Sequence, residues 1–260
     1  MNPSEIPRAT RRLLRLSGAI RVAGREARSL DSARARALWQ QRHAVAMLDA
    51  MEVEVEVRGT RPSEGLVVSN HLGYLDILVI ASQFPCVFVS KSEVRSWPFI
   101  GNLLSAAGTI LTDRNRRQSA RRTAVEIRET LELGLPVVVF PEGTSSDGSQ
   151  VLPFRSSLLD SSSESAWPSH PMAISYRGSG GNPGRDVCYW GDASFLPHLV
   201  NLARIHPLKA TLAIGSPEAE KLPRKIAATL LRNEVIRLLD ETRKTPPPDD
   251  NSPPMRGTAL

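Results

Sequence analysis

Cysteine is scarce in this sequence, with only Cys86 and Cys188 among 260 residues. Both stand in apolar surroundings, and neither has a partner at a spacing typical of a metal site. Two scattered cysteines favour a reducing compartment over a structural disulfide. The sequence therefore does not favour a small disulfide-stabilised scaffold or a cysteine-ligated metal centre.

Long apolar runs are also missing. The longest stretches, such as 77–81 and 136–140, are far shorter than the roughly 18 apolar residues that a membrane-spanning helix needs. A secretory signal needs a continuous apolar block after its positive start, and arginines interrupt every candidate near the N-terminus. We therefore expect a protein that stays on the cytoplasmic side of the membrane.

Acidic residues are few where basic ones are most frequent. The first 36 residues hold three acids (Glu5, Glu26, Asp31) and nine arginines: Arg8, Arg11, Arg12, Arg15, Arg21, Arg25, Arg28, Arg34 and Arg36. This excess of six positive charges equals the formal net charge of the whole chain, +6. It indicates an anionic partner reached through a docking arm. Nucleic acid is not favoured, because the sequence shows no aromatic stacking pattern.

Within this arm, residues 8–23 carry Leu13, Leu16, Ile20 and Ala23 at helical spacing, and arginines fill most of the other face. A basic amphipathic helix of this kind suits the headgroup region of an anionic leaflet. A solvated helix packed on its own domain is the alternative. Gly18 weakens the helix in either case.

Strand and helix patterns alternate over the rest of the chain. Strands are expected at 52–58, 66–69, 87–90, 137–140, 172–176, 187–190 and 210–214, and the strictly alternating first one is expected to be peripheral. Helices are expected at 33–50, 74–82 and 197–205, between the N-cap Ser119 and Gly134, and around the apolar positions Ala227, Leu231, Val235 and Leu238.

The predicted fold is α/β: a single domain with a mostly parallel or mixed central sheet flanked by helices, plus an N-terminal helical arm. We assign residues 1–50 to a membrane-docking arm and residues 51–244 to the domain. The proline-rich, polar residues 245–260 form an expected disordered tail.

A histidine and an aspartate follow the expected strand at 66–69, where a helix begins. His71 and Asp76 are five residues apart across this turn, and active sites of α/β sheets favour the carboxyl ends of strands. A histidine can take a proton from a hydroxyl near neutral pH when a carboxylate fixes its tautomer. Chance, or capping of the helix by Asp76, also explains such a spacing.

Two further segments offer groups that can bind a substrate. Arg114 ends an apolar stretch, where its planar fork can bind phosphate; an ordinary surface turn with Asp113 is the alternative. After the strand at 137–140, Glu142 can accept hydrogen bonds from substrate hydroxyls, Gly143 permits close approach of the backbone, and Thr144 adds a hydroxyl. A plain strand-to-loop turn explains this second segment equally well.

Taken together, these segments resemble the glycerolipid acyltransferase family, in particular bacterial lysophosphatidic acid acyltransferases and their ornithine-lipid relatives. The matches follow the family's order: His71 and Asp76 for its first block, Gly108 to Arg114 for its second, Phe140 to Thr144 for its third, and His170 to Ile174 for its fourth. The link between the first two blocks also matches, and the likeness spans about residues 50–215.

This resemblance implies an acyltransferase in which His71, oriented by Asp76, deprotonates the free hydroxyl of a lysolipid. The hydroxyl oxygen then attacks an acyl thioester, carried by coenzyme A or by acyl carrier protein. Arg114, Glu142, Gly143 and Thr144 would hold the acceptor. No cofactor and no metal are expected, and the enzyme would sit peripherally on the cytoplasmic face of the inner membrane.

The expected acceptor is 1-acylglycerol-3-phosphate, giving phosphatidic acid, with a lyso-ornithine lipid as the alternative. Ser157 stands where relatives usually have glycine, and the fourth block has His170 before Pro171 and lacks paired valines. These departures leave the headgroup open. Two other classes are a hydrolase or metal-dependent phosphatase, which lacks a second histidine at ligand spacing, and a catalytically silent lipid-binding protein.

Overall fold

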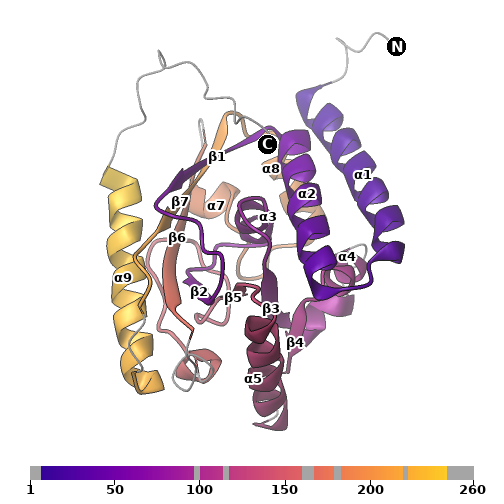
Figure 1. The fold of residues 1–260 in the computed structure, drawn as a ribbon. Coiled ribbons are helices and arrows are strands. Elements are labelled where there is room, and N and C mark those ends of the chain that lie inside the picture. The colour runs from indigo at the N-terminus through magenta and orange to yellow at the C-terminus, as the bar shows by residue number, and fades with distance from the viewer. Residues whose placement is uncertain are drawn as a thin grey trace.

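A computed structural model describes residues 7–96, 100–113, 117–159, 167–178, 183–218 and 222–244. Arg114 and the expected disordered tail at 245–260 lie outside these residues. Within them, a mixed seven-stranded sheet is flanked by helices on both faces (Figure 1). The α/β class with a mixed central sheet is therefore confirmed.

The sheet has the strand order β1-β7-β6-β2-β5-β3-β4. The strands are β1 (Val53–Arg58), β2 (Leu66–Ser69), β3 (Val87–Lys91), β4 (Ile110–Thr112), β5 (Val137–Val139), β6 (Ser169–Gly178) and β7 (Leu208–Ile214). All neighbours pair in parallel except β6 and β7, which are antiparallel. The strand expected to be peripheral is indeed the edge strand β1.

Helices cover the two faces of this sheet. They are α1 (Arg8–Glu26), α2 (Ala33–Met51), α3 (Leu75–Ala81), α4 (Ile100–Ala106), α5 (Arg117–Glu132), α7 (Pro183–Asp186), α8 (Phe195–Leu202) and α9 (Arg224–Lys244), with short 3₁₀ turns η2 (Ala27–Ser29), η3 (Ser92–Ser96) and η4 (Ser156–Leu159). Alternate residues of β2 serve both faces: Val67 packs with the core under α1, α2 and α3, whereas Leu66 and Val68 pack with α5 and α9. Burial on both sides explains why the central strands are continuously apolar.

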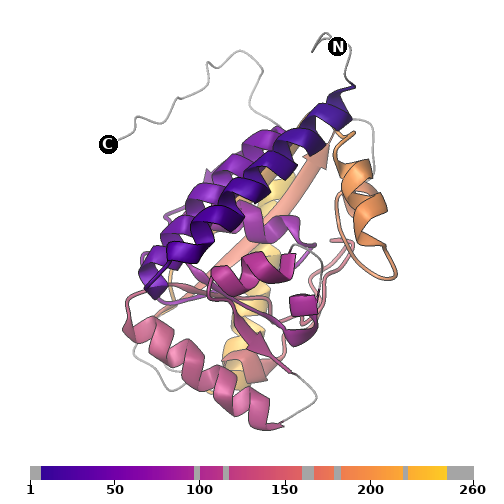
Figure 2. The same ribbon diagram turned by 90° about the vertical axis from the view of Figure 1, so that its right-hand side faces the viewer.

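The N-terminal helix α1 packs along α2 on the outside of the molecule (Figure 2). Leu16 and Ala23 are buried, Leu13 and Ile20 pack partly against the same core, and the Trp39 indole donates a hydrogen bond to the Ala23 carbonyl at 3.2 Å. The apolar stripe of α1 is thus used within the protein. The membrane role of residues 1–50 stays a prediction and depends on the outward surface of α1.

Two local expectations were wrong. Residues 187–190 form no strand: α7 precedes them, and the Tyr189 N–H donates to the Leu72 carbonyl at 2.8 Å, so this backbone pairs with the loop after β2 instead of with a strand. Ser119 is not an N-cap, because α5 already begins at Arg117. The Ser119 hydroxyl instead accepts a hydrogen bond from the Asp113 N–H at 2.8 Å.

The sequence analysis also missed α4 and the short strand β4. Both fall in the segment between Ser92 and Asp113, where Gly101 and Gly108 interrupt any long helical or alternating pattern. As to membrane crossing, none of the helices in the described ranges is long and apolar enough to span a bilayer.

The end of β2 is fixed by a side chain. The last residue of β2, Ser69, pairs with Met172 of β6, and β6 continues past this pair. The N–H and C=O of Ile174 would therefore have no partner in β2. The buried Asn70 amide takes that place: its oxygen accepts from the Ile174 N–H at 2.8 Å, and its nitrogen donates to the Ile174 carbonyl at 3.0 Å. The chain can therefore leave the sheet at residue 70 without unpaired backbone groups.

This geometry predicts that Asn70→Ala lowers the free energy of unfolding by about 2–4 kcal/mol, because two buried backbone groups lose their partners. Chemical denaturation of the purified protein measures this loss. Asn102→Ala, an exposed position in α4, is the matched control and should change stability by about 0.5 kcal/mol or less. Equal stability of the two variants would contradict the role given to Asn70.

Candidate active site

His71 and Asp76 are in direct contact. The turn between β2 and α3 brings His71 Nδ1 to 2.8 Å from Asp76 Oδ2. Asp76 lies in the first turn of α3, where a negative charge interacts favourably with the positive end of the helix. The pair expected from the sequence is therefore assembled at the carboxyl end of a central strand.

The Asp76 carboxylate is fully buried and is held by hydrogen bonds at both oxygens. Oδ2 also accepts from the N–H groups of Leu72 at 2.6 Å and Gly73 at 3.0 Å, and Oδ1 accepts from the Tyr176 hydroxyl at 2.7 Å. Burying a charge requires such compensation. Asp76 thus organises the turn and orients His71 at the same time, but it does not cap α3, whose N-cap position is Tyr74 and has no side-chain hydrogen bond.

These contacts define the tautomer of His71. Asp76 Oδ2 is an acceptor to two backbone donors, so Nδ1 of His71 donates to it and Nε2 is left to accept a proton. The imidazole stacks on Phe140, with ring centroids 4.1 Å apart, and its side chain is 22% exposed. A fixed, partly accessible imidazole of this kind can act as a general base.

Glu142 supports His71 from the turn that follows the neighbouring strand β5. Its two carboxylate oxygens accept hydrogen bonds from the backbone N–H groups of His71 at 2.8 Å and Leu152 at 2.9 Å. The sequence interpretation assigned this carboxylate to acceptor hydroxyls; here it joins the first and third blocks through the backbone. Burial raises the pKa of Glu142 to about 7, although both N–H groups act in the opposite direction.

The rest of the third block forms a turn beside His71. Gly143 has φ +78°, a conformation that glycine adopts without strain, and Thr144 is exposed. Two residues further on, the Ser146 N–H donates to the His71 carbonyl at 3.0 Å. The structure therefore gathers His71, Asp76, Glu142, Gly143 and Thr144 around one turn, and of the expected site residues only Arg114 lies outside the described part of the chain.

Tyr176 is a site residue that sequence reasoning missed. It lies on β6, one hundred positions from the carboxylate that it contacts, and burial together with the charge of Asp76 raises the pKa of its hydroxyl well above the ordinary value. The one available signal was a tyrosine at the end of an apolar strand, since a buried tyrosine hydroxyl needs a partner. The sequence could not say which partner that is.

A cavity of about 560 Å³ is lined by neighbours of the pair, although neither His71 nor Asp76 lines it. Leu72, which follows His71, and Tyr176, which contacts Asp76, both line it. Apolar side chains and the charged residues Asp147, Arg177, Arg185 and Arg243 share its wall. Such a mixed lining suits an amphipathic molecule.

The two cysteines are free and buried. Burial raises the pKa of the Cys188 thiol to about 12 and raises that of Cys86 further. Since the thiolate is the nucleophilic form, neither residue is poised for attack. Within the described ranges, no three His, Cys, Asp or Glu side chains lie together as a possible metal site.

Comparisons with known proteins identify the family to which this chain belongs. The model of the family described as "Acyltransferase" matches residues 52–175. A lyso-ornithine lipid O-acyltransferase of Rhizobium meliloti (strain 1021) is 33% identical over 78% of this chain and 73% of its own length. A 1-acyl-sn-glycerol-3-phosphate acyltransferase of Neisseria meningitidis serogroup B is 31% identical over 69% of this chain and 76% of its own length.

The fold agrees with that of a solved structure. The crystal structure of the 1-acyl-sn-glycerophosphate acyltransferase PlsC from Thermotoga maritima superposes with a TM-score of 0.65, at 21% identity over 92% of this chain and 99% of that one. The chain belongs to the acyltransferase family. It is an O-acyltransferase.

The raised pKa of Glu142 predicts a pH-dependent stability. Its folded pKa of about 7 lies above the ordinary 4.5, so its contribution is complete below about pH 4.5 and is lost as the pH rises through 7. Measured against Glu142→Gln, which cannot titrate, the free energy of unfolding of the wild type should fall over this range by up to roughly 3 kcal/mol.

Denaturant titrations of both proteins at several pH values between about 4.5 and 8 provide the comparison. The glutamine side chain of the variant keeps the shape of the carboxyl group, so differences in packing between the two proteins stay constant with pH. A difference in stability that did not change across this range would show that burial leaves the Glu142 pKa near its ordinary value.

Proposed function

We propose that this enzyme transfers a fatty acyl group from an acyl thioester to the free hydroxyl of a lysolipid. Nε2 of His71 takes the hydroxyl proton while the oxygen attacks the thioester carbonyl. The carbon–sulfur bond then breaks, and the thiol leaves with the proton from the imidazolium. The acyl group moves in one transfer, so no serine or cysteine nucleophile is needed.

The His71–Asp76 contact in a chain of the acyltransferase family is the observation that carries this proposal. In this mechanism His71 becomes positively charged while the acceptor proton is in transit. The buried carboxylate of Asp76, 2.8 Å from Nδ1, stabilises that charge and keeps Nε2 directed at the substrate. Tyr176 and the two N–H groups on Asp76 keep the carboxylate in place.

Acyl-coenzyme A or acyl carrier protein would supply the thioester as a co-substrate, and the chemistry described requires no cofactor. The sequence by itself left a catalytically silent lipid-binding protein as the alternative. The fixed tautomer and partial exposure of His71 favour catalysis, because a lipid-binding surface alone has no use for an oriented base. Turnover of a thioester donor separates the two.

Two lysolipids are candidates for the acceptor. The sequence pattern favoured 1-acylglycerol-3-phosphate, and the Neisseria relative carries that name. The Rhizobium relative is named for lyso-ornithine lipid, and its likeness is somewhat greater and extends over more of this chain. We propose lyso-ornithine lipid as a candidate of equal standing, and a direct comparison of the two acceptors decides.

Both acceptor and product are lipids, so we propose that the enzyme works peripherally at the cytoplasmic face of the inner membrane, with an anionic leaflet as its partner. The half-exposed arginines near the N-terminal end of α1 support this. Arg8, Arg11 and Arg15 are each about half exposed on this helix, and Leu14 beside them is 57% exposed. Positive charge beside an exposed apolar side chain is typical of interfacial helices.

For the chemistry, we expect His71→Ala to lower acyl transfer by about 10²–10⁴-fold, the usual contribution of a general base. Asp76→Asn should be severely impaired as well, since a carboxamide neither balances an imidazolium nor accepts from every donor around Asp76. Steady-state transfer of a labelled acyl group, with folding checked by circular dichroism, measures both. Wild-type turnover by a folded His71→Ala variant would refute the mechanism.

For the acceptor, we propose that Arg114 binds phosphate. Arg114→Ala should then raise KM for 1-acylglycerol-3-phosphate by about 10- to 150-fold, equivalent to losing a charge-assisted contact of about 1.5–3 kcal/mol. KM for the thioester donor should change little. Parallel assays with lyso-ornithine lipid show which headgroup the enzyme prefers. An unchanged acceptor KM would remove Arg114 from the site.

A further inference from the structure

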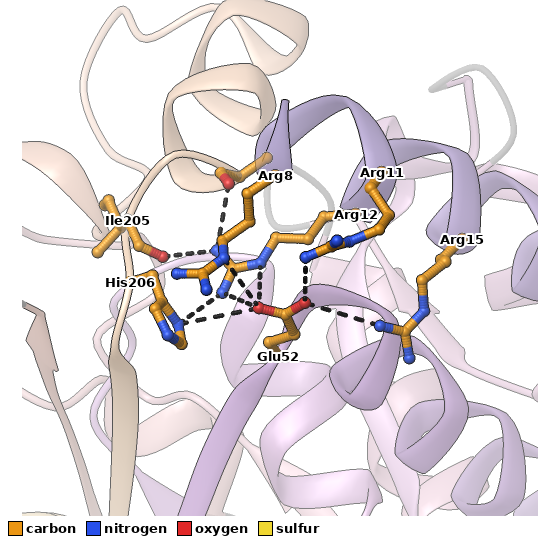
Figure 3. Close-up of polar contacts among 8 residues, drawn as sticks. Arg8, Arg11, Arg12, Arg15, Glu52, Ile205 and His206 are labelled. Carbon is orange, nitrogen blue, oxygen red and sulfur yellow. Dashed lines mark hydrogen bonds and ion pairs between the residues drawn. The ribbon is translucent and has the colours of Figure 1, made fainter. Parts of the chain in front are cut away.

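Four arginines of α1 converge on one carboxylate. Arg8, Arg11, Arg12 and Arg15 follow each other at spacings of three, one and three residues, so they share one face of the helix. All four form ion pairs with Glu52, which stands between α2 and β1 (Figure 3). Like charges at such spacings repel one another, so this concentration of positive charge requires an explanation.

Arg12 is the fully buried member of this cluster. Its side chain has no exposed surface, and all three guanidinium nitrogens donate hydrogen bonds. Nε and Nη2 donate to Glu52 Oε2 at 3.2 and 3.0 Å, Nη1 donates to the carbonyls of Ala203 and Ile205 at 3.1 and 2.6 Å, and Nη2 also donates to His206 Nδ1 at 2.9 Å. Arg12 therefore fixes α1 to the domain and has no capacity left for a ligand.

The other three arginines are held differently. Arg8, Arg11 and Arg15 lie 3.7, 3.8 and 3.7 Å from the Glu52 oxygens, beyond hydrogen-bonding distance, and their side chains are 52%, 46% and 50% exposed. One carboxylate cannot neutralise four guanidinium groups, and in the described part of the chain these three arginines pair with no other acid. The three half-exposed guanidinium groups therefore lie close together around the Glu52 carboxylate, which does not neutralise all of their charge.

Glu52 is retained at a position that disfavours it. It caps α2 in the left-handed conformation at φ +54°, where glycine or asparagine is usual, and it is the only non-glycine residue of the described ranges with a positive φ. Burial raises the Glu52 pKa, but hydrogen bonds and charges from Arg12, with charges from Arg8 and Arg11, outweigh burial and hold it below the ordinary value. The backbone strain indicates that this carboxylate serves to assemble the arginines.

The arginine cluster is connected through α8 to the turn that carries His71. Arg12 binds the carbonyls just after this helix, and within α8 His198 Nδ1 lies 2.8 Å from the hydroxyl of Tyr74, three residues from His71. Figure 2 shows α8 beside the N-terminal end of α1. Leu14 on α1 and Leu196 on α8 are among the most exposed apolar side chains, at 57% and 68%.

We propose that Arg8, Arg11 and Arg15 form a binding site for the phosphate group of an anionic membrane phospholipid, built on the Arg12–Glu52 pair. Guanidinium groups bind phosphate oxygens in two-point fashion, and a phosphate here relieves the repulsion that Glu52 leaves uncompensated. The exposed leucines contact the lipid beside it. This inference rests on the proposed function, because a lysolipid acyltransferase meets its acceptor at such a surface.

The test compares two triple variants of the full-length chain that remove equal charge from the same segment. Arg8→Gln/Arg11→Gln/Arg15→Gln removes the site and keeps Arg12. Arg21→Gln/Arg25→Gln/Arg28→Gln removes three exposed arginines that do not pair with Glu52. Affinity for phosphatidylglycerol vesicles, with phosphatidylcholine vesicles as the neutral reference, is measured by co-sedimentation.

If the arginines act only as a diffuse basic surface, removing each one lowers vesicle affinity about fivefold. Both triple variants would then lose the same affinity. The proposal requires at least a tenfold greater loss in the Arg8/Arg11/Arg15 variant. Equal losses would overturn it. If inorganic phosphate at constant ionic strength displaced the protein from vesicles as well as a soluble phospholipid does, the site would recognise free phosphate, and the membrane lipid would be the wrong source.

Two further measurements keep the outcomes separate. If the triple variant does not fold, Arg11→Gln against Arg25→Gln gives the same comparison with one charge each. Acyl transfer to a short-chain, water-soluble acceptor should be within twofold of wild type in both triple variants. Absence of any acyl transfer by the wild type would reject the proposed function, whereas equal vesicle binding by the two variants would reject only the phosphate site.

Discussion

The geometry around His71 depends on one buried carboxylate. Asp76 has no contact with solvent, and it remains compatible with the fold because His71, Tyr176 and two backbone N–H groups donate to it. A buried charge with fewer partners would be costly. The same four bonds shape the turn after β2, select the tautomer of His71 and join that turn to β6. Local structure and chemical competence therefore have a common origin.

Around this carboxylate, side chains replace sheet hydrogen bonds where strands must end. Asn70 completes the pairing of Ile174 so that β2 can stop, and Glu142 ties the end of β5 to the backbone of His71. Both residues hold backbone atoms, so they set where His71 stands without facing the reacting groups. The proposed chemistry uses His71 as its single base. The other polar residues that follow β2 and β5 are needed to hold the backbone around it.

A second buried charge, Arg12, performs a comparable role near the N-terminus. Arg12 fixes α1 to the loop after α8 as Asp76 fixes the turn after β2, and each uses a complete set of hydrogen bonds to do so. The arginines around Arg12 are therefore presented on a rigid helix. Positive charge on a rigid helix is directed toward one side of the molecule, unlike charge on a flexible tail.

The sequence by itself determined much of the framework. Apolar runs and periodicity located most strands and long helices, because burial on both faces of a sheet leaves a local signature in β2 and β5. The ordered blocks identified His71 and Asp76, which are five residues apart and so are joined by a local turn. Segments with irregular patterns were placed wrongly: residues 187–190 pair with Leu72, and Ser119 binds Asp113.

Only the tertiary structure decided which distant groups meet. Tyr176 reaches Asp76 from another strand, Glu142 binds two backbone N–H groups, and Glu52 gathers four arginines. The stripe Leu13, Leu16 and Ile20 looked the same in sequence whether it faced lipid or protein, and packing against α2 turned it inward. Periodicity records that a side chain avoids water, but the identity of its partner depends on contacts between segments far apart in the chain.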